Sequence, residues 1–177
     1  MTELFKIILG SSIVTTLLTS IIAYIFHKKT ERTNAEIKRE FEILSQDFDW
    51  KQKTTELLGQ VYIHLNRTRL AFENKYSKLK KYDAFYEDEI FYSSNKRIRD
   101  ILLENGHHIP PELLEEASKL IEHYDAWLIK YNNLRKVNKD ETTIQIYVGP
   151  DGFRFPEKAE DMFKEKYTEM FQVIRRI

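Results

Sequence analysis

Residues 7–26, IILGSSIVTTLLTSIIAYIF, contain no charged side chain, and this stretch decides how the rest of the chain is interpreted. A helix over these residues rises about 1.5 Å per residue and is about 30 Å long, which matches the hydrocarbon core of a bilayer. The sequence therefore predicts a single transmembrane helix within residues 1–29. A cleaved signal peptide is the alternative, but the first residues, MTELFK, are not clearly basic, and the stretch ends in bulky residues that are poor cleavage sites.

Basic residues after the stretch predict its orientation. Lys28, Lys29 and Arg32 follow it directly, and Lys38 and Arg39 come soon after. Flanking Lys and Arg residues are retained on the cytoplasmic side of a membrane. We therefore expect the N-terminus outside and the remainder of the chain in the cytoplasm.

Small residues recur through the stretch in steps of four, with bulky aliphatic residues between them. Such ladders let two helices approach closely in lipid, and Ser or Thr can hydrogen-bond across the contact. The pattern predicts a face for association with a second copy or another protein. The alternative is that the hydroxyls bond only to their own helix. The predicted face comprises Ser11, Ser12, Thr15, Thr16, Thr19, Ser20 and Ala23.

Helical periodicity dominates the rest of the 177 residues and predicts a mainly α fold. We expect a juxtamembrane helix over residues 30–48, in which Ile37, Phe41, Leu44 and Phe48 have coiled-coil spacing. Ser45, Asp47 and Asp49 favour a helix start and predict a break or kink near 45–49. Residues 49–177 are expected to form one cytoplasmic antiparallel helical bundle. Its predicted helices cover residues 50–81, 84–104, 111–137 and 156–177. The third of these has a predicted buried stripe of Leu113, Ala117, Leu120, Ile121, Tyr124, Leu128, Tyr131 and Leu134.

One short β-hairpin is predicted at residues 143–156, where TIQIYV, the turn GPDG and FRF follow one another. The strand period of two puts Phe153 and Phe155 on one face and Arg154 on the other. Two interpretations stay open. The rings fill the helical core, or the three residues present an edge to a partner protein.

Composition and missing motifs argue against several classes of function. Lys+Arg 28 against Asp+Glu 28 leaves no net charge to attract nucleic acid. The absence of Cys excludes disulfides, thiol nucleophiles and Cys-based metal centres. G-x-S-x-G, P-loop and G-x-G-x-x-G motifs are missing, and the five His residues, among them the adjacent His107 and His108, lack the spacing of metalloenzymes. We therefore predict no enzymatic activity, no cofactor and no metal.

Most of the region after the stretch resembles a family of small, uncharacterised bacterial membrane-anchored proteins. IPPELLEEASKLIEHYDAWL at 109–128 and VGPDGFRFPEKAEDMFKEKY at 148–167 carry the resemblance, and ELLGQVYIHLNRTRLAFE at 56–73 resembles the central helix of that family. The resemblance implies a bacterial inner or plasma membrane location. It implies no activity and no site residue.

The leading hypothesis is a non-enzymatic, single-pass, membrane-tethered interaction or scaffold protein. It would self-associate through the transmembrane helix as a homo-oligomer and bind a cytoplasmic protein through the bundle, with the lipid bilayer but no nucleic acid among its partners. An alternative is an oligomeric effector of a bacterial stress or phage-defence system that acts on the membrane. A metal-dependent enzyme is the second alternative.

Overall fold

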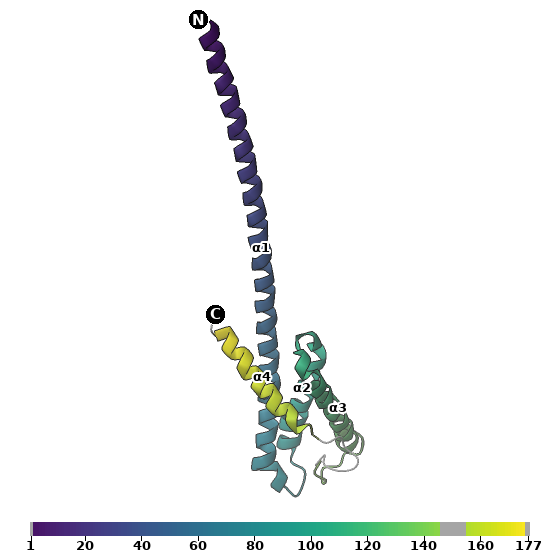
Figure 1. Cartoon of the computed structure of the whole chain (residues 1–177). Coiled ribbons are helices and arrows are strands. Elements are labelled where there is room, and N and C mark those ends of the chain that lie inside the picture. Colours follow the sequence, from purple (N-terminus) through teal and green to yellow (C-terminus); the bar gives the residue numbers. More distant parts are fainter. Residues whose placement is uncertain (1, 146–154, 176–177) are drawn as a thin grey trace. The chain divides into compact units, whose positions relative to one another are not determined.

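The structure is a computed structural model that describes residues 2–145 and 155–175, with the backbone alone for residues 2–14. The described residues form an all-α structure with four α-helices (Figure 1). The elements in chain order are α1 (Thr2–Asn74), the 3₁₀ turn η1 (Tyr76–Lys78), the π-helix η2 (Phe85–Tyr92), α2 (Ser93–Glu104), the 3₁₀ turns η3 (Gly106–His108) and η4 (Pro111–Leu113), α3 (Leu114–Tyr131), the π-helix η5 (Asn132–Val137) and α4 (Glu157–Arg175).

The contacts of the chain divide it into two units, Met1–Asp47 and Phe48–Ile177. In the first unit, every side chain from residue 15 onward is exposed. The buried hydrophobic residues that the structure describes all belong to the second unit. The predicted boundaries at residues 29 and 48 stay predictions.

The main core of the second unit is aliphatic and draws on all four α-helices. Helix α1 contributes Leu58 and Val61 to it because apolar residues recur at helical spacing along one side of the helix. The full set of buried members is Leu57, Leu58, Val61, Leu65, Ile98, Ile101, Leu102, Ile109, Leu113, Ala117, Leu120, Tyr124, Ala159, Phe163 and Met170.

A second, aromatic cluster combines residues of η1, η2 and α3. It consists of Tyr76, Phe91, Trp127 and Tyr131. The rings of Trp127 and Tyr131 are stacked with their centroids 5.3 Å apart, and those of Tyr76 and Phe91 lie 4.7 Å apart. Aromatic pairs at these distances add to the stability that burial alone provides.

Two predicted helix boundaries are wrong. Residues 45–49 are helical, because no Gly or Pro interrupts the sequence there and the side chains of Ser45, Asp47 and Asp49 are exposed. At the other end, α1 stops at Asn74 instead of residue 81. The chain leaves the helix at this point, which allows Tyr76 to become buried in the aromatic cluster.

The predicted hairpin is not seen where the structure describes its residues. Residues 143–145 and 155–156 form no strand, and 146–154 lie outside the described residues. Instead, Ile144 packs against the aromatic cluster. The side chain of Gln145 donates a hydrogen bond to the backbone carbonyl of Trp127, a member of that cluster. The chain turns inward here because the Asp140 carboxylate accepts hydrogen bonds from the backbone N–H groups of Thr142 and Thr143.

Among the residues searched, which are the described ones, no helix has a stretch that is both long enough and apolar enough to cross a membrane. The side chains of residues 7–14, the first part of the predicted span, lie outside the described residues.

Candidate functional site

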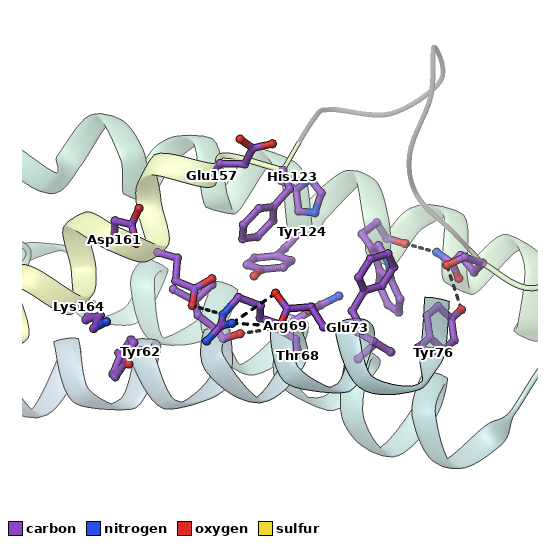
Figure 2. Close-up of a pocket in the computed structure, with 18 residues that line it drawn as sticks. Tyr62, Thr68, Arg69, Glu73, Tyr76, His123, Tyr124, Glu157, Asp161 and Lys164 are labelled. Carbon is purple, nitrogen blue, oxygen red and sulfur yellow. Dashed lines mark hydrogen bonds and ion pairs between the residues drawn. The ribbon is translucent and has the colours of Figure 1, made fainter. Parts of the chain in front are cut away.

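A pocket of about 760 Å³ lies within the second unit, between α1, α3 and α4 (Figure 2). Aromatic side chains from all parts of this unit form much of its wall. They are Tyr62 and Phe72 of α1, Tyr76 of η1, Phe91 of η2, Tyr124 and Trp127 of α3, and Phe155 just before α4. The volume is in the range of small-molecule sites, which are largely apolar with a few polar groups that orient the ligand.

Two buried polar atoms of pocket-lining residues have no hydrogen-bond partner among the described residues. They are the hydroxyl oxygen Oη of Tyr124 and the amide oxygen Oε1 of Gln145. The two residues are only 2% and 3% exposed. Because a buried polar group without a partner is destabilising by about 1–3 kcal/mol, such groups indicate a missing ligand or water.

Tyr124 projects from α3 toward the α1 residues Thr68 and Arg69 (Figure 2). Burial, and to a lesser extent the nearby Glu160 carboxylate, raises the pKa of the Tyr124 hydroxyl far above its usual range. The hydroxyl is therefore neutral at physiological pH. It can donate its proton in one hydrogen bond and accept another.

Gln145 is held in place by three hydrogen bonds of its own. Its backbone N–H donates to Oε1 of Glu87 at 3.1 Å, and its backbone carbonyl accepts from the Tyr76 hydroxyl at 3.1 Å. Its side-chain Nε2 donates to the backbone carbonyl of Trp127, also at 3.1 Å. The amide oxygen Oε1 of Gln145 is therefore held in a fixed position without a partner of its own among the described residues.

A buried ion pair between the two π-helices, η2 and η5, holds Gln145 in position. Glu87 of η2 is fully buried, and its Oε2 accepts a hydrogen bond of 2.9 Å from Nε of Arg135 in η5. Oε1 of Glu87 lies 2.8 Å from the Tyr76 hydroxyl oxygen, which shares its one proton between this carboxylate and the Gln145 carbonyl, and burial together with the carboxylate raises the pKa of Tyr76 well above its usual range. The Arg135 guanidinium also lies over the ring of Tyr82, 4.2 Å from its centroid. π-Helical segments are rare and frequently occur at functional sites.

Charged residues of α1 and α4 line another part of the pocket. Nε of Arg69 donates to Oε1 of Glu160 at 2.7 Å, and its terminal nitrogens bond Glu73 at 3.2 Å and Asn66 at 2.8 Å. The charged lining residues are the carboxylates Glu73, Glu157, Glu160 and Asp161 and the cations Arg69 and Lys164. Four carboxylates against two cations give the lining a net charge of −2, with His123 taken as neutral.

The predicted partner edge contributes one residue to this pocket. Phe155 lines it, and its ring centroid lies 5.4 Å from that of His123. Phe153 and Arg154 lie outside the described residues.

The predicted association face lies in the first unit. The side chains of Ser11 and Ser12 are outside the described residues, whereas Thr15, Thr16, Thr19, Ser20 and Ala23 are exposed on α1. The Thr19 hydroxyl donates to the backbone carbonyl of Thr15 at 2.8 Å, and the Ser20 hydroxyl to that of Thr16 at 2.9 Å. Both open interpretations of the ladder accommodate these bonds, since back-bonded hydroxyls still leave a small surface for a neighbouring helix.

Sequence reasoning missed the residues that define the pocket. Tyr124 was expected only as part of a buried stripe, and Gln145 only as a strand residue. Glu87 and Arg135 carried no signal, because both occur in stretches rich in charge. Only the tertiary structure brings Gln145, Glu87 and Arg135 together, and only it places Tyr124 and Gln145 in the lining of one pocket.

His107 and His108 lie on η3 with their ring centroids 3.9 Å apart. Within the described residues, no three His, Asp or Glu side chains are grouped in a way that could hold a metal ion.

Comparisons of the chain with protein-family models, with curated proteins and with solved structures give no match. The resemblance of residues 56–73, 109–128 and 148–167 to bacterial membrane-anchored proteins stays a prediction.

Proposed function

We propose that this chain is a non-enzymatic, membrane-tethered binding module. In this proposal, residues 7–26 anchor it, α1 mediates self-association, and the unit Phe48–Ile177 takes up a ligand in the pocket between α1, α3 and α4. The observation that carries the proposal is the pair of buried, unpartnered atoms, Oη of Tyr124 and Oε1 of Gln145, in the wall of a pocket of about 760 Å³.

The chemistry of these two groups supports binding over catalysis. A side-chain amide does not ionise at physiological pH, and the raised pKa of Tyr124 keeps its hydroxyl neutral. Both groups can orient a ligand by hydrogen bonds, whereas a general base needs a pKa near the working pH.

The apolar surface of α1 supports the membrane tether. Leu17, Leu18, Ile21 and Ile22 are each more than half exposed, within the stretch that lacks charges. Contiguous apolar surface of this kind is unfavourable in water and favourable against lipid. The basic residues after position 27 support a cytoplasmic position for the Phe48–Ile177 unit. The family resemblance suggests a bacterial inner or plasma membrane.

Self-association is proposed along the small residues of the same helix. With Thr19 and Ser20 bonded back to their own backbone, these side chains present little polar surface to lipid and allow close helix packing. Leucine in place of both Thr16 and Ser20 should lower the oligomer size of the purified protein. An unchanged size would remove the ladder from the proposal.

A photocrosslinking experiment tests whether the pocket is occupied in cells. Phe72 lines the pocket and is 39% exposed, so p-benzoylphenylalanine in its place would react with a bound ligand. The matched control replaces Leu103, an exposed residue of α2 outside the pocket lining. After irradiation of intact cells, mass spectrometry of the purified chain should show a discrete adduct at position 72 and none at position 103.

The Tyr124→Phe variant makes this test specific, because it removes the hydroxyl and retains the ring. We expect it to lower the yield of the adduct at position 72. Adducts of equal yield at both positions, or none at position 72, would contradict a ligand-binding role for the pocket.

A further inference from the structure

We infer that the ligand of the pocket is a small organic cation, an ammonium group carried on an apolar body. This inference rests on the proposed binding function and specifies the class of ligand. Three features of the pocket lead to it: its aromatic walls, its excess of carboxylates and its two buried hydrogen-bonding atoms.

The aromatic walls suit both parts of such a ligand. Trp127 and Tyr124 of α3 lie on one side of the pocket and Phe72 of α1 on another. Ring faces carry partial negative charge and attract ammonium groups, most strongly where water is excluded. The same rings provide apolar contact for the hydrocarbon body.

The charges of the lining select a cation over a neutral or anionic ligand. Arg69 is bonded to two carboxylates, those of Glu160 and Glu73, so its charge is more than compensated by its own partners. Asp161 of α4 adds a further carboxylate to the wall. An anion entering the pocket would be repelled by the net negative charge, whereas an ammonium group would be stabilised.

The two unpartnered atoms can receive the N–H groups of the cation. Oε1 of Gln145 is an acceptor, and Oη of Tyr124 can accept through a lone pair. An ammonium has three donors and no acceptor, so it can donate to either oxygen. Hydrogen bonds to a charged donor are about twice as strong as neutral ones.

The size of the pocket favours a small molecule over a protein segment. A volume of about 760 Å³ can enclose a ligand with a single ring and a short chain, with room for water. Phe155 and His123, whose rings are in edge-to-face contact, further wall the pocket.

Three probes of similar shape test the inference: phenylethylammonium, the neutral 2-phenylethanol and the anionic 3-phenylpropionate. The full-length chain is measured in lipid nanodiscs, and the signal of empty nanodiscs is subtracted. The chain has two Trp residues, Trp50 and Trp127. In a Trp50→Phe background, the fluorescence emission therefore comes only from Trp127, which lines the pocket. We expect phenylethylammonium to bind about tenfold more tightly than the alcohol, and the carboxylate to bind most weakly.

Variants then locate the binding and separate charge from shape. Tyr124→Phe should weaken phenylethylammonium binding about fivefold, as expected for one hydrogen bond. Asp161→Asn should weaken it about twofold and leave the alcohol unaffected, because only the cation senses the lost charge. Glu165→Gln is the matched control, since Glu165 is an exposed carboxylate of α4 outside the pocket lining.

The outcomes distinguish this inference from the function on which it rests. If the alcohol binds as tightly as the ammonium, or if Glu165→Gln weakens binding as much as Asp161→Asn, the cation inference is wrong and the pocket keeps its binding role. If none of the probes changes the Trp127 emission while the adduct at position 72 forms in cells, the ligand belongs to another class. If the adduct also fails to form, the proposed function itself is contradicted.

Discussion

Arg135 and Glu87 form an ion pair that is removed from solvent, with side chains 6% and 0% exposed. Removing one partner of such a pair leaves the other as an uncompensated buried charge. We therefore expect Arg135→Met to lower the free energy of unfolding by about 3–5 kcal/mol, measured by urea denaturation followed by circular dichroism. The loss should extend to ligand binding, since Glu87 also holds the backbone of Gln145.

The control is an ion pair of similar length at the surface. Lys53 and Asp49 are 2.7 Å apart with both side chains at least half exposed, so Lys53→Met should change stability by less than about 1 kcal/mol. Replacing Glu87 and Arg135 together by Met should recover most of the loss, because neither charge is then left alone. An Arg135→Met variant that is as stable as Lys53→Met would contradict a structural role for the pair.

His64 makes stability depend on pH. Burial lowers the pKa of its imidazole below 6.5, and the positive charges of Arg67 and Arg97 lower it further. Between the folded and unfolded pKa values the unfolded chain binds more protons, so the free energy of unfolding falls as the pH drops below about 6.5. We expect the decrease between about pH 7.5 and pH 5.5 to be smaller in His64→Asn than in the natural chain.

Nuclear magnetic resonance titration of the imidazole provides the direct measurement, and its midpoint should lie below 6.5, the value for a free His. His108, whose pKa is also lowered by burial and by His107, should retain part of the pH dependence in the variant. A midpoint for His64 above 6.5 would contradict the prediction.

At the scale of elements, the contact between α1 and α4 depends on Gly59. A Cβ atom at this position would lie 3.0 Å from Cε2 of Tyr167, whose ring also packs against Tyr62 and Phe171. A larger side chain must displace this ring, so we expect Gly59→Leu to destabilise the chain by about 1–3 kcal/mol in thermal or urea unfolding.

In a Tyr167→Ala background, Gly59→Leu should stabilise the chain instead of destabilising it. The space is then open, and Leu gains about 0.8 kcal/mol over Gly in helix propensity. Gly106→Ala is the control in the natural chain, because no described atom outside its own neighbours lies within 4 Å of an added Cβ. A destabilising Gly59→Leu in both backgrounds would show that the close approach to Tyr167 is not the cause.

Helices were predictable from the sequence where apolar residues keep a strict helical period. The buried residues Leu113, Ala117, Leu120 and Tyr124 all belong to the stripe expected for residues 111–137. Local capping residues were a poorer guide, since the predicted break at 45–49 lies within α1. The π-helical geometry of η2 and η5 was not predicted, and the ion pair of Glu87 with Arg135 that joins these two elements forms between residues far apart in the sequence.

The pocket could not be predicted for a related reason. Its walls combine residues from Tyr62 to Lys164, and its defining property is the lack of a partner for Tyr124 and Gln145. Such a lack is a property of three-dimensional packing. Only Phe155 was singled out from the sequence, on the strength of the aromatic residues around Arg154.

At the scale of the whole molecule, the chain distributes its apolar residues in two ways. Among the described residues between 57 and 170, most buried apolar side chains pack against one another in two clusters. Between residues 15 and 47 the large apolar side chains are all exposed. Contiguous exposed apolar surface is stabilised by contact with lipid or with another apolar surface in place of water. The absence of charge in residues 7–26 favours lipid as the contact for this part of α1.

Two pairs of Arg substitutions test whether lipid contacts residues 7–26. Ile21 and Ile22 are more than half exposed within the stretch without charges, and Ile43 and Leu44 are more than half exposed in the charged part of the same helix. If residues 7–26 cross a bilayer, replacing Ile21 and Ile22 by Arg costs about 3 kcal/mol per residue on insertion, so the chain should move from the membrane fraction to the soluble fraction of lysed cells. Ile43→Arg with Leu44→Arg should leave it in the membrane fraction, because these positions would remain in water. An equal effect of both pairs would mean that lipid does not cover residues 7–26, and the tether would then be excluded from the proposed function.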